Sequence, residues 1–307
     1  MHENGVYDSL FLMGQVLKVL ELFNDHLYHC IKDGDELKGK TRMKIAFVDI
    51  DGTVLDYSRG MNEPTERCLK AFQAFRNQGN LLIIATSRTK LVDGLDASMF
   101  DGFVFSNGQY IAFKDKVLKN NIFTKEQIIL QQDVYTKHQG GAFYSGISGQ
   151  WISPTNIDLS IAHMVHYGLD PNKVQDHFLA FVLDEIEATA ATATFRNMED
   201  MRAAQFELPQ DWEIHAYYDE RDLRMDVHLP GVTKGSSCMF LVEHANLKRE
   251  DSYAFGDGMN DIEMLGLVGH GVAMGNADPR VKAIADTISD DALEDGLAKA
   301  FERLFGF

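Results

Sequence analysis

The most informative segment of this chain is Lys44-Ile45-Ala46-Phe47-Val48-Asp49-Ile50-Asp51-Gly52-Thr53, where an apolar run ends in two acids. A run that is apolar at every position predicts a parallel strand buried on both faces. Residues i and i+2 of an extended chain point the same way, so we expect the carboxylates of Asp49 and Asp51 to converge beyond the strand, where open α/β sheets bind ligands. Converging carboxylates repel unless a cation holds them together, and an oxygen-rich site favours Mg²⁺.

Three later segments supply the groups that such a site lacks. Ile83 to Arg88 is a second apolar strand that ends in hydroxyl side chains, Gly231 to Gly235 places one lysine at a predicted helix start, and Ala254 to Asp261 is a third strand that ends in acids. A nucleophilic carboxylate, a hydroxyl donor, an ammonium group and metal ligands are the set that phosphoryl transfer to a carboxylate requires. The alternative interpretation, a solvated Asp-Gly turn after a strand, explains none of these later segments.

The motifs resemble those of the haloacid-dehalogenase (HAD) superfamily, and specifically its Cof-type phosphatases with a large inserted C2-type cap. The resemblance covers the chain from about Met43 to Phe307, and one departure is Ser87, where the family usually has glycine. The matching segments, in chain order, are Asp49 to Thr53, Thr86 to Arg88, Lys234, Gly256 to Leu265, Gly271 to Ala277 and Glu294 to Gly296.

The resemblance implies a role for each residue of the first three motifs. It makes Asp49 the nucleophile that attacks phosphorus. It makes Asp51 the acid that protonates the leaving oxygen and the base that then activates water, with its backbone carbonyl on the metal. Thr86, the aligned position, is implied to donate a hydrogen bond to the phosphoryl group, and Ser87 adds a hydroxyl beside it. Lys234 is implied to neutralise Asp49 and the phosphate.

The fourth motif is implied to complete the metal site that the two acids of the first motif begin. Asp257 is the implied third protein ligand of Mg²⁺. Asp261 belongs to the same metal site, either behind the ligands or paired with Lys234, and capping of the next helix is compatible with both. Asn260 is implied to contact phosphate or to support the loop, and Asn276 to orient the substrate.

The order of strand and helix patterns predicts an α/β fold: a Rossmann-like parallel-sheet core of the HAD type, an inserted α+β cap and an N-terminal helical extension. We expect the extension and its linker at residues 1–42, the catalytic core at 43–109 and 223–307, and the cap at 110–222. Within the cap, the spacing of apolar residues predicts a helix over 174–189, among others.

The composition restricts the partners and the compartment. A formal net charge of −17 and a pI near 5.0 argue against non-specific binding to nucleic acid or to acidic membranes. A phosphorylated substrate must therefore be held by local cations such as Lys234 and by the metal. The three cysteines, Cys30, Cys68 and Cys238, are scattered and have no metal-ligand spacing, which favours a reducing compartment. We expect a cytoplasmic protein.

The first forty residues require a separate interpretation. Apolar residues recur between Asp8 and Ile31 with the spacing of an amphipathic helix. Lys18, Glu21 and Asp25 interrupt the apolar run, which argues against a membrane span, and a basic leader and a cleavage site are lacking, which argues against a secretory signal. We expect this helix to pack on the core or on a neighbouring chain, so self-association through it stays open.

The sequence therefore predicts a Mg²⁺-dependent phosphomonoester hydrolase that acts on a small phosphorylated metabolite, such as a sugar phosphate, through an aspartyl-phosphate. Two alternatives remain: a phosphomutase or phosphotransferase that passes the phosphate to another acceptor, and a non-catalytic metabolite-binding protein. The intact Asp49, Asp51 and Lys234 argue against the second, because a binding module needs no nucleophile. Specificity is expected in the cap, where the candidate contacts are Trp151, Arg196, Arg202, Tyr217 and Tyr218.

Overall fold

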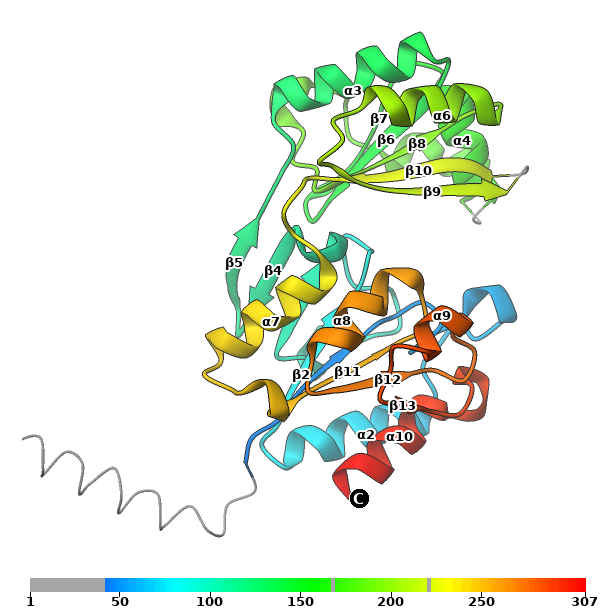
Figure 1. The fold of residues 1–307 in the computed structure, drawn as a ribbon. Helices are drawn as coiled ribbons and strands as arrows, with labels where there is room; N and C mark the ends of the chain where they lie inside the picture. Colours follow the sequence, from blue (N-terminus) through cyan, green and yellow to red (C-terminus); the bar gives the residue numbers. More distant parts are fainter. Residues whose placement is uncertain (1–41, 167–168, 220–221) are drawn as a thin grey trace, which may run out of the picture. The chain divides into compact units, whose positions relative to one another are not determined.

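The computed structural model describes residues 42–166, 169–219 and 222–307, whose fold is drawn in Figure 1. The helix expected at residues 8–31 and nearly all of its linker lie outside the described residues. Two sheets organise the described chain, one of eight strands and one of five. Within these ranges, every helix is too short or too polar to cross a membrane.

The first sheet is parallel at its centre, as expected. Its order is β13-β12-β11-β1-β2-β3-β4-β5, with antiparallel pairing only of β3 with β4 and of β4 with β5. The carboxyl ends of the parallel strands therefore meet at one edge. The strands are β1 (Ile45–Val48), β2 (Leu81–Ala85), β3 (Gly102–Phe105), β4 (Tyr110–Phe113), β5 (Lys116–Asn120), β11 (Ser252–Gly256), β12 (His270–Ala273) and β13 (Thr287–Ile288).

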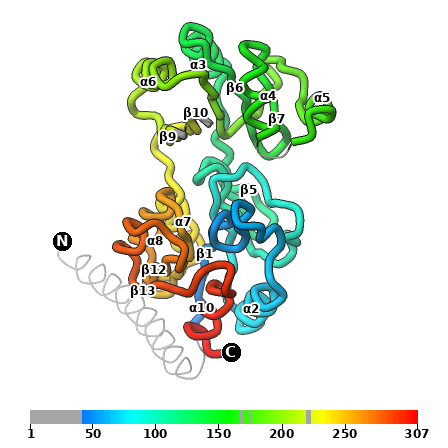
Figure 2. The backbone as a smooth tube through the Cα atoms, turned by 90° about the vertical axis from the view of Figure 1, so that its right-hand side faces the viewer, coloured from blue at the N-terminus to red at the C-terminus, as the bar shows by residue number. Residues whose placement is uncertain are grey.

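Helices cover both faces of this sheet, which explains why β1 is apolar at every position. Figures 1 and 2 show α2 and α10 side by side on one face, where they pack with Ala46 and Val48 in one apolar cluster. Ile45 and Phe47 point into a second cluster, formed with the helices of the other face. The helices are α2 (Glu66–Asn77) and α10 (Gly296–Phe305) on the first face, and α7 (Lys234–His244), α8 (Ile262–Leu267) and α9 (Pro279–Lys282) on the second.

The sequence signals around α2 show why it forms where it does. Its N-cap is Thr65, whose hydroxyl accepts a hydrogen bond from the backbone N–H of Cys68, and the chain leaves the helix through Gly79 at φ +83°. Phe72 and Phe75 are fully buried and meet the ring of Phe301 edge-on, with ring centroids 5.4 and 5.3 Å away. Burial of each such side chain contributes about 1.5–3 kcal/mol.

The second sheet is antiparallel, and its two faces differ in character. Its order is β7-β6-β8-β10-β9, and α3 and α6 pack against one face in an apolar cluster that includes Tyr144, Met225 and Val227. The helix α4 lies against the opposite face, with His163 stacked near the ring of Phe143. The elements are α3 (Lys125–Lys137), β6 (Gly141–Gly146), β7 (Gly149–Ile152), α4 (Ile157–His166), α5 (Val174–His177), β8 (Ala190–Thr194), α6 (Met198–Glu207), β9 (Glu213–Asp219) and β10 (Asp222–His228).

The helix expected over residues 174–189 is wrong. Only α5 is helical, and the following chain is irregular apart from a 3-10 turn at Leu183–Glu185. Phe181, Leu183 and Ile186 still pack on the apolar cluster of the second sheet, but they reach it from an irregular backbone. The apolar spacing therefore predicted the buried side chains correctly but the backbone conformation incorrectly. An irregular segment that lies along an apolar cluster can bury the same side chains as a helix.

The predicted domain limits stay a prediction, and the sheets divide the chain at slightly different places. The strands β4 and β5, which we assigned to the cap, pair with the first sheet, and β10, which we assigned to the core, pairs with the second. By hydrogen bonding, the chain passes from the first sheet to the second between Asn120 and Lys125, and it returns between His228 and Lys234.

Candidate active site

The candidate site lies at the carboxyl-terminal edge of the first sheet, where open α/β sheets bind ligands. Asp49 directly follows β1, Thr86 follows β2 and Asp257 follows β11. Lys234 is the first residue of α7, whose N-cap Thr233 accepts a hydrogen bond from the backbone N–H of Ser236. Four segments that are far apart in the chain therefore contribute to one site.

A buried ammonium group joins two of the predicted acids. Lys234 Nζ donates hydrogen bonds to Asp49 Oδ1 at 2.7 Å and to Asp261 Oδ1 at 2.6 Å, and the Lys234 side chain is 1% exposed. A cation at a helix N-terminus opposes the helix dipole, so the two carboxylates are needed to hold it there. Burial lowers the pKa of Lys234, but the charges of Asp261 and Asp49 outweigh it and leave the pKa raised.

Asp261 also fixes the loop that carries Asp257. Its second oxygen, Oδ2, accepts hydrogen bonds from the backbone N–H groups of Asp257 at 3.0 Å and Gly258 at 2.9 Å. The side chain of Asp261 is fully buried and holds Lys234 with its other oxygen. Asp261 therefore pairs with Lys234, one of the two arrangements that we considered for it.

The acids Asp49, Asp257 and Asp261 form a cluster that fits a cation. One carboxylate oxygen of each lies within 4.8 Å of the others. Burial raises the pKa of Asp49 well above its usual value, although Lys234 opposes the shift, and burial followed by the charge of Asp261 raises the pKa of Asp257 to about 7. Three carboxylates beside one ammonium group thus carry unfavourable negative charge. A divalent cation with oxygen preference would relieve it.

Asp49 and Asp51 both line the same cleft, as expected, but their carboxylates have different partners. The extended chain ends at Val48, and the backbone N–H groups of Val54 and Leu55 both bond to the carbonyl of Ile50, which turns the chain back. The Asp51 side chain is 46% exposed, and its two oxygens accept hydrogen bonds from Arg88 at 2.7 Å each. Asp51 is therefore held by Arg88 at the cleft, whereas Asp49 is held by the buried Lys234.

The polar residues of the second and fourth motifs occupy different environments. Thr86 is fully buried, and its hydroxyl accepts a hydrogen bond from the backbone N–H of Arg88 at 3.2 Å. Ser87 and Asn260 line a cleft of about 790 Å³, and Asn260 Nδ2 lies 3.4 Å from Asn107 Oδ1. The roles of Thr86, Ser87 and Asn260 in binding phosphate stay predictions.

One face of the second sheet lines the same cleft. Along β10, Met225 and Val227 point to α3 and α6. The residues that alternate with them, Arg224, Asp226 and His228, line the cleft. The same alternation holds on β6 and β8. The residues of this face, which we call the cleft face, are Phe143, Ser145, Ala190, Thr192, Tyr217, Arg224, Asp226 and His228.

The cleft face is polar and nearly balanced in charge. Thr192 Oγ1 donates a hydrogen bond to Asp226 Oδ1 at 2.9 Å, and the Arg224 guanidinium lies 3.8 Å from the ring centre of Tyr217. His228 is 2% exposed, and neither ring nitrogen has a hydrogen-bond partner among the described residues. Burial lowers the pKa of His228, so the ring is neutral at pH 7.

Comparison with known proteins identifies the family. The model of the haloacid dehalogenase-like hydrolases matches residues 46–301. This chain belongs to that family. The HAD chain is 28% identical over 271 residues to a putative phosphatase of Bacillus subtilis (strain 168), with 85% of this chain and 97% of the relative covered. It is also 28% identical over 269 residues to the 5-amino-6-(5-phospho-D-ribitylamino)uracil phosphatase of the same organism, with 85% of this chain and 95% of the relative covered.

Two further comparisons agree with this assignment. The phosphoglycolate phosphatase of Methanothermobacter thermautotrophicus is 26% identical over 86% of this chain and 100% of its own length. The solved structure of the HAD subclass IIB sugar phosphatase BT4131 has a TM-score of 0.69 and 26% identity, and covers 86% of this chain and 99% of that chain. The predicted α/β fold and hydrolase of the HAD phosphatase type are thereby confirmed, and the C2 classification of the cap stays a prediction.

Sequence reasoning missed several residues of the HAD cleft. Arg88 was part of a quoted motif but received no role, although its position after β2 is the same signal that selected Thr86. Among the candidate cap contacts, Tyr217 lines the cleft, whereas Trp151 is buried in the apolar cluster of the second sheet. Arg196 instead pairs with Asp158, and Arg202 lies over the ring of Tyr218.

Proposed function

We propose that this HAD hydrolase is a Mg²⁺-dependent phosphatase that removes phosphate from a small metabolite, in the first place a sugar phosphate, through an aspartyl-phosphate on Asp49. The observation that carries the proposal is the buried Asp49–Lys234–Asp261 contact beside Asp257. A binding module would gain nothing from three clustered carboxylates, because they repel a phosphorylated ligand unless a cation joins them.

The residues that would hold Mg²⁺ are Asp49 and Asp257, with the backbone carbonyl of Asp51 and with Asp261 behind them. When bound, the ion neutralises charge on the phosphoryl oxygens and stabilises the ionised Asp49. Lys234 orients Asp49 through the 2.7 Å hydrogen bond, so that one carboxylate oxygen is fixed and the other is available to attack. Positioning of this kind supplies most of the catalysis in phosphoryl transfer.

The proposed reaction has two steps, transfer of the phosphoryl group to Asp49 and its transfer from Asp49 to water. In the first, an oxygen of Asp49 forms a bond to phosphorus, the bond to the ester oxygen breaks, and Asp51 gives its proton to the leaving alcohol. In the second, water attacks phosphorus, Asp51 accepts the proton of that water, and the bond between phosphorus and Asp49 breaks. Both oxygens of Asp51 are occupied by Arg88 in the structure, so this ion pair opens before each proton transfer.

The cleft face supports a hydroxyl-rich leaving group. The charges of Arg224 and Asp226 offset each other, and burial lowers the pKa of His163, which lines the cleft from α4, to about 4, so this part of the cleft offers hydrogen bonds with little net charge. A second anionic group on the substrate would find no excess of positive charge there. Similarity to a sugar phosphatase of the same family points the same way. Two buried free cysteines, Cys68 and Cys238, are compatible with a cytoplasmic location.

Phosphate release with and without Mg²⁺ tests the proposal. A panel of phosphorylated sugars, nucleotides and vitamin cofactors is incubated with the wild type and with Asp49→Asn. We expect turnover that requires Mg²⁺ in the wild type and a loss on the order of 10⁴-fold in the variant, because the nucleophile is gone. Equal turnover in both proteins would refute the mechanism.

Asp101→Asn is the matched control. Asp101 pairs with Arg76 and accepts a hydrogen bond from the backbone N–H of Leu82 at 2.9 Å, in the segment that precedes β3. It lies near the amino end of β2, away from the edge that carries Asp49. The same substitution there should lower the melting temperature and leave turnover within about twofold, since distant sites act independently.

A further inference from the structure

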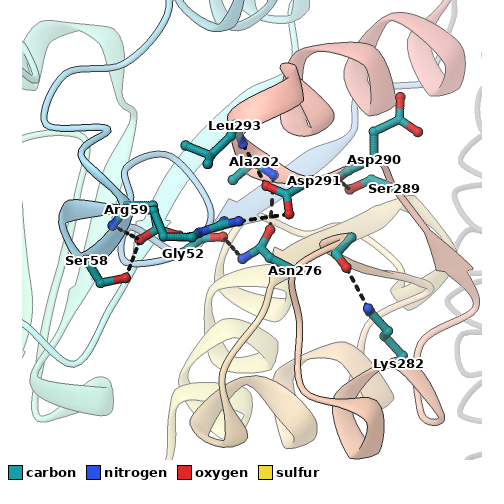
Figure 3. Close-up of polar contacts among 12 residues, drawn as sticks. Gly52, Ser58, Arg59, Asn276, Lys282, Ser289, Asp290, Asp291, Ala292 and Leu293 are labelled. Carbon is teal, nitrogen blue, oxygen red and sulfur yellow. Dashed lines mark hydrogen bonds and ion pairs between the residues drawn. The ribbon is translucent and has the colours of Figure 1, made fainter.

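The loop that follows β1 is fastened by a side chain from another part of the sheet. Asn276, three residues after β12, donates a hydrogen bond from Nδ2 to the backbone carbonyl of Gly52 at 2.7 Å. Its Oδ1 accepts a hydrogen bond from the backbone N–H of Ala292 at 3.0 Å. Figure 3 shows this amide between the two backbone segments. One side chain therefore joins the catalytic loop to the segment before α10.

The position of Gly52 makes this contact sensitive. Gly52 has φ +81°, and a Cβ built there would lie 2.1 Å from Asp257 Oδ2. The next residue, Thr53, places its hydroxyl 3.5 Å from Asp257 Oδ1. The preceding residue is Asp51. The carbonyl held by Asn276 thus belongs to the peptide between Gly52 and Thr53, the two residues that lie against Asp257.

The same distant segment holds the far end of this loop. Arg59 Nη1 contacts Asp291 Oδ2 at 2.9 Å (Figure 3). Arg59 Nε contacts Asp56 Oδ2 at 2.6 Å. Asp291 directly precedes Ala292, the residue bound by Asn276. The loop is therefore attached near both of its ends to one short segment, and Asn276 is the attachment nearer to Asp49.

We propose that Asn276 is a positioning residue: it fixes the Gly52 peptide and thereby the aim of Asp49 and Asp51 relative to Asp257. Asn276 is not among the residues that line the cleft, so it acts through the loop and not on the substrate as we first expected. An amide is required because one end must donate and the other must accept. The inference rests on the proposed function for its kinetic part only.

Asn80 supplies a matched control on the same sheet. Its Oδ1 accepts a hydrogen bond from the backbone N–H of Lys44 at 2.9 Å, and its Nδ2 donates to the carbonyl of Phe75 at 3.1 Å. It is 6% exposed and bridges two backbone segments, as Asn276 does, but it lies next to the amino ends of β1 and β2. The two asparagines thus perform the same structural task at opposite ends of β1.

The test compares Asn276→Asp with Asn80→Asp in the full-length protein. Each change replaces a donor by an oxygen that repels the carbonyl it faced. For Asn276→Asp we expect kcat with p-nitrophenyl phosphate and Mg²⁺ to fall by about 10- to 100-fold with KM changed little, since small misplacements near the reacting atoms cost this much. Hydrogen exchange of the Thr53 and Val54 amides, which bond to Ile50, should also accelerate about tenfold or more.

Asn80→Asp should lower the melting temperature at least as much while kcat and these two amides stay as in the wild type. The inference is overturned if Asn276→Asp keeps wild-type kcat and amide protection, or if Asn80→Asp reproduces its loss of kcat. Asn276→Ala, which removes both bonds without adding charge, replaces Asn276→Asp if that variant does not fold, with the same expectation. A wild type that hydrolyses no ester refutes the proposed function, and the exchange measurement still decides the role of Asn276.

Discussion

The two sheets place their functional side chains by different rules. The first sheet uses strand ends: Asp49 and Asp257 lie just beyond β1 and β11, where the backbone turns and charges can be buried in fixed geometry. The second sheet uses a strand face: Arg224, Asp226 and His228 of β10 line the cleft, and the residues that alternate with them build the apolar cluster. The difference separates two tasks, chemistry that depends on a few exact positions and recognition that is spread over a surface.

The electrostatics of the two regions differ in the same way. Two buried carboxylates, Asp49 and Asp261, share the Lys234 cation beside the half-buried Asp257, and removing either partner of a buried ion pair leaves charge without compensation. On the cleft face, the single pair of opposite charges, Arg224 and Asp226, is accompanied by neutral donors and acceptors. We therefore expect large effects on turnover from the first region and graded effects on selectivity from the second.

The largest effect is expected from Asp257→Asn. Loss of this carboxylate should weaken Mg²⁺ binding by at least about 10- to 100-fold and reduce turnover severely, because a first-sphere ligand is removed. The metal-free variant should melt at or above the wild-type temperature at pH 8, since the raised pKa of Asp257 means that its charged form destabilises the folded state. Thermal melts with and without Mg²⁺ measure both quantities.

Asp261→Asn is the informative comparison for that result. Asp261 holds Lys234 and two backbone N–H groups, so we expect a loss of stability of about 3–5 kcal/mol, as for one partner of a buried ion pair. An Asp257 variant with wild-type affinity for Mg²⁺ would show that Asp257 is not a ligand of the ion. An Asp261 variant with wild-type stability would show that its contacts with Lys234 and the loop do not stabilise the fold.

An intermediate effect is expected on the cleft face. Arg224→Gln should lower kcat/KM for the best sugar phosphate by about 10- to 100-fold, the range for one hydrogen bond to a charged group. The loss should be smaller for p-nitrophenyl phosphate, whose leaving group has no hydroxyls. Arg196→Gln, which removes an arginine paired with Asp158 outside the cleft, is the control and should change neither value. Equal losses for both substrates would show that Arg224 does not contribute to selectivity.

The smallest effect is expected from Arg59→Gln and depends on pH. Hydrogen bonds from Ser58 and Arg59 outweigh burial and lower the pKa of Asp56, and hydrogen bonding to Arg59 lowers that of Asp291. Lowered pKa values stabilise the folded protein above about pH 4, the value of a free aspartate, and this contribution is lost as the pH falls through the folded pKa values. Urea denaturation should therefore show a loss of about 1 kcal/mol at pH 7 that shrinks at pH 3.

Arg280→Gln is the control for the pH experiment. Arg280 pairs with Asp278 on the surface and is 68% exposed, so its removal should have no measurable effect at either pH. A loss from Arg59→Gln that is the same at pH 3 and pH 7 would show that packing of the side chain, and not its ion pairs, stabilises the loop.

The extent to which the sequence predicted the site follows from this contrast. Residues beyond strand ends form contiguous motifs, so Asp49 and Asp257 could be selected by inspection, and their meeting follows from parallel topology. Lys234 could be selected from its place at a predicted helix start. The pairing of Asp51 with Arg88 could not be predicted, because it depends on the turn that the hydrogen bonds to Ile50 form after β1. The pairing of Asn276 with Gly52 joins residues 224 apart in the chain and leaves no local pattern.

The cleft face could not be predicted from the sequence for a different reason. Ala190 to Thr194 reads Ala-Ala-Thr-Ala-Thr, and alanine favours helices over strands. The alternation of small residues carries a weak hydrophobic signal, so β8 and the direction of Thr192 became visible only once β6 and β10 were paired on either side of it. Strand pairing over a long sequence separation determined the assignment here.

The alternation along β10 also suggests how the protein can be diversified. Arg224, Asp226 and His228 face the cleft, while Met225 and Val227, their chain neighbours, belong to the apolar cluster. A mutant library restricted to Arg224 and Asp226, with the buried His228 kept, would sample many recognition surfaces on an unchanged scaffold. After gene duplication, substitutions at the same positions could likewise change the substrate without disturbing the apolar cluster.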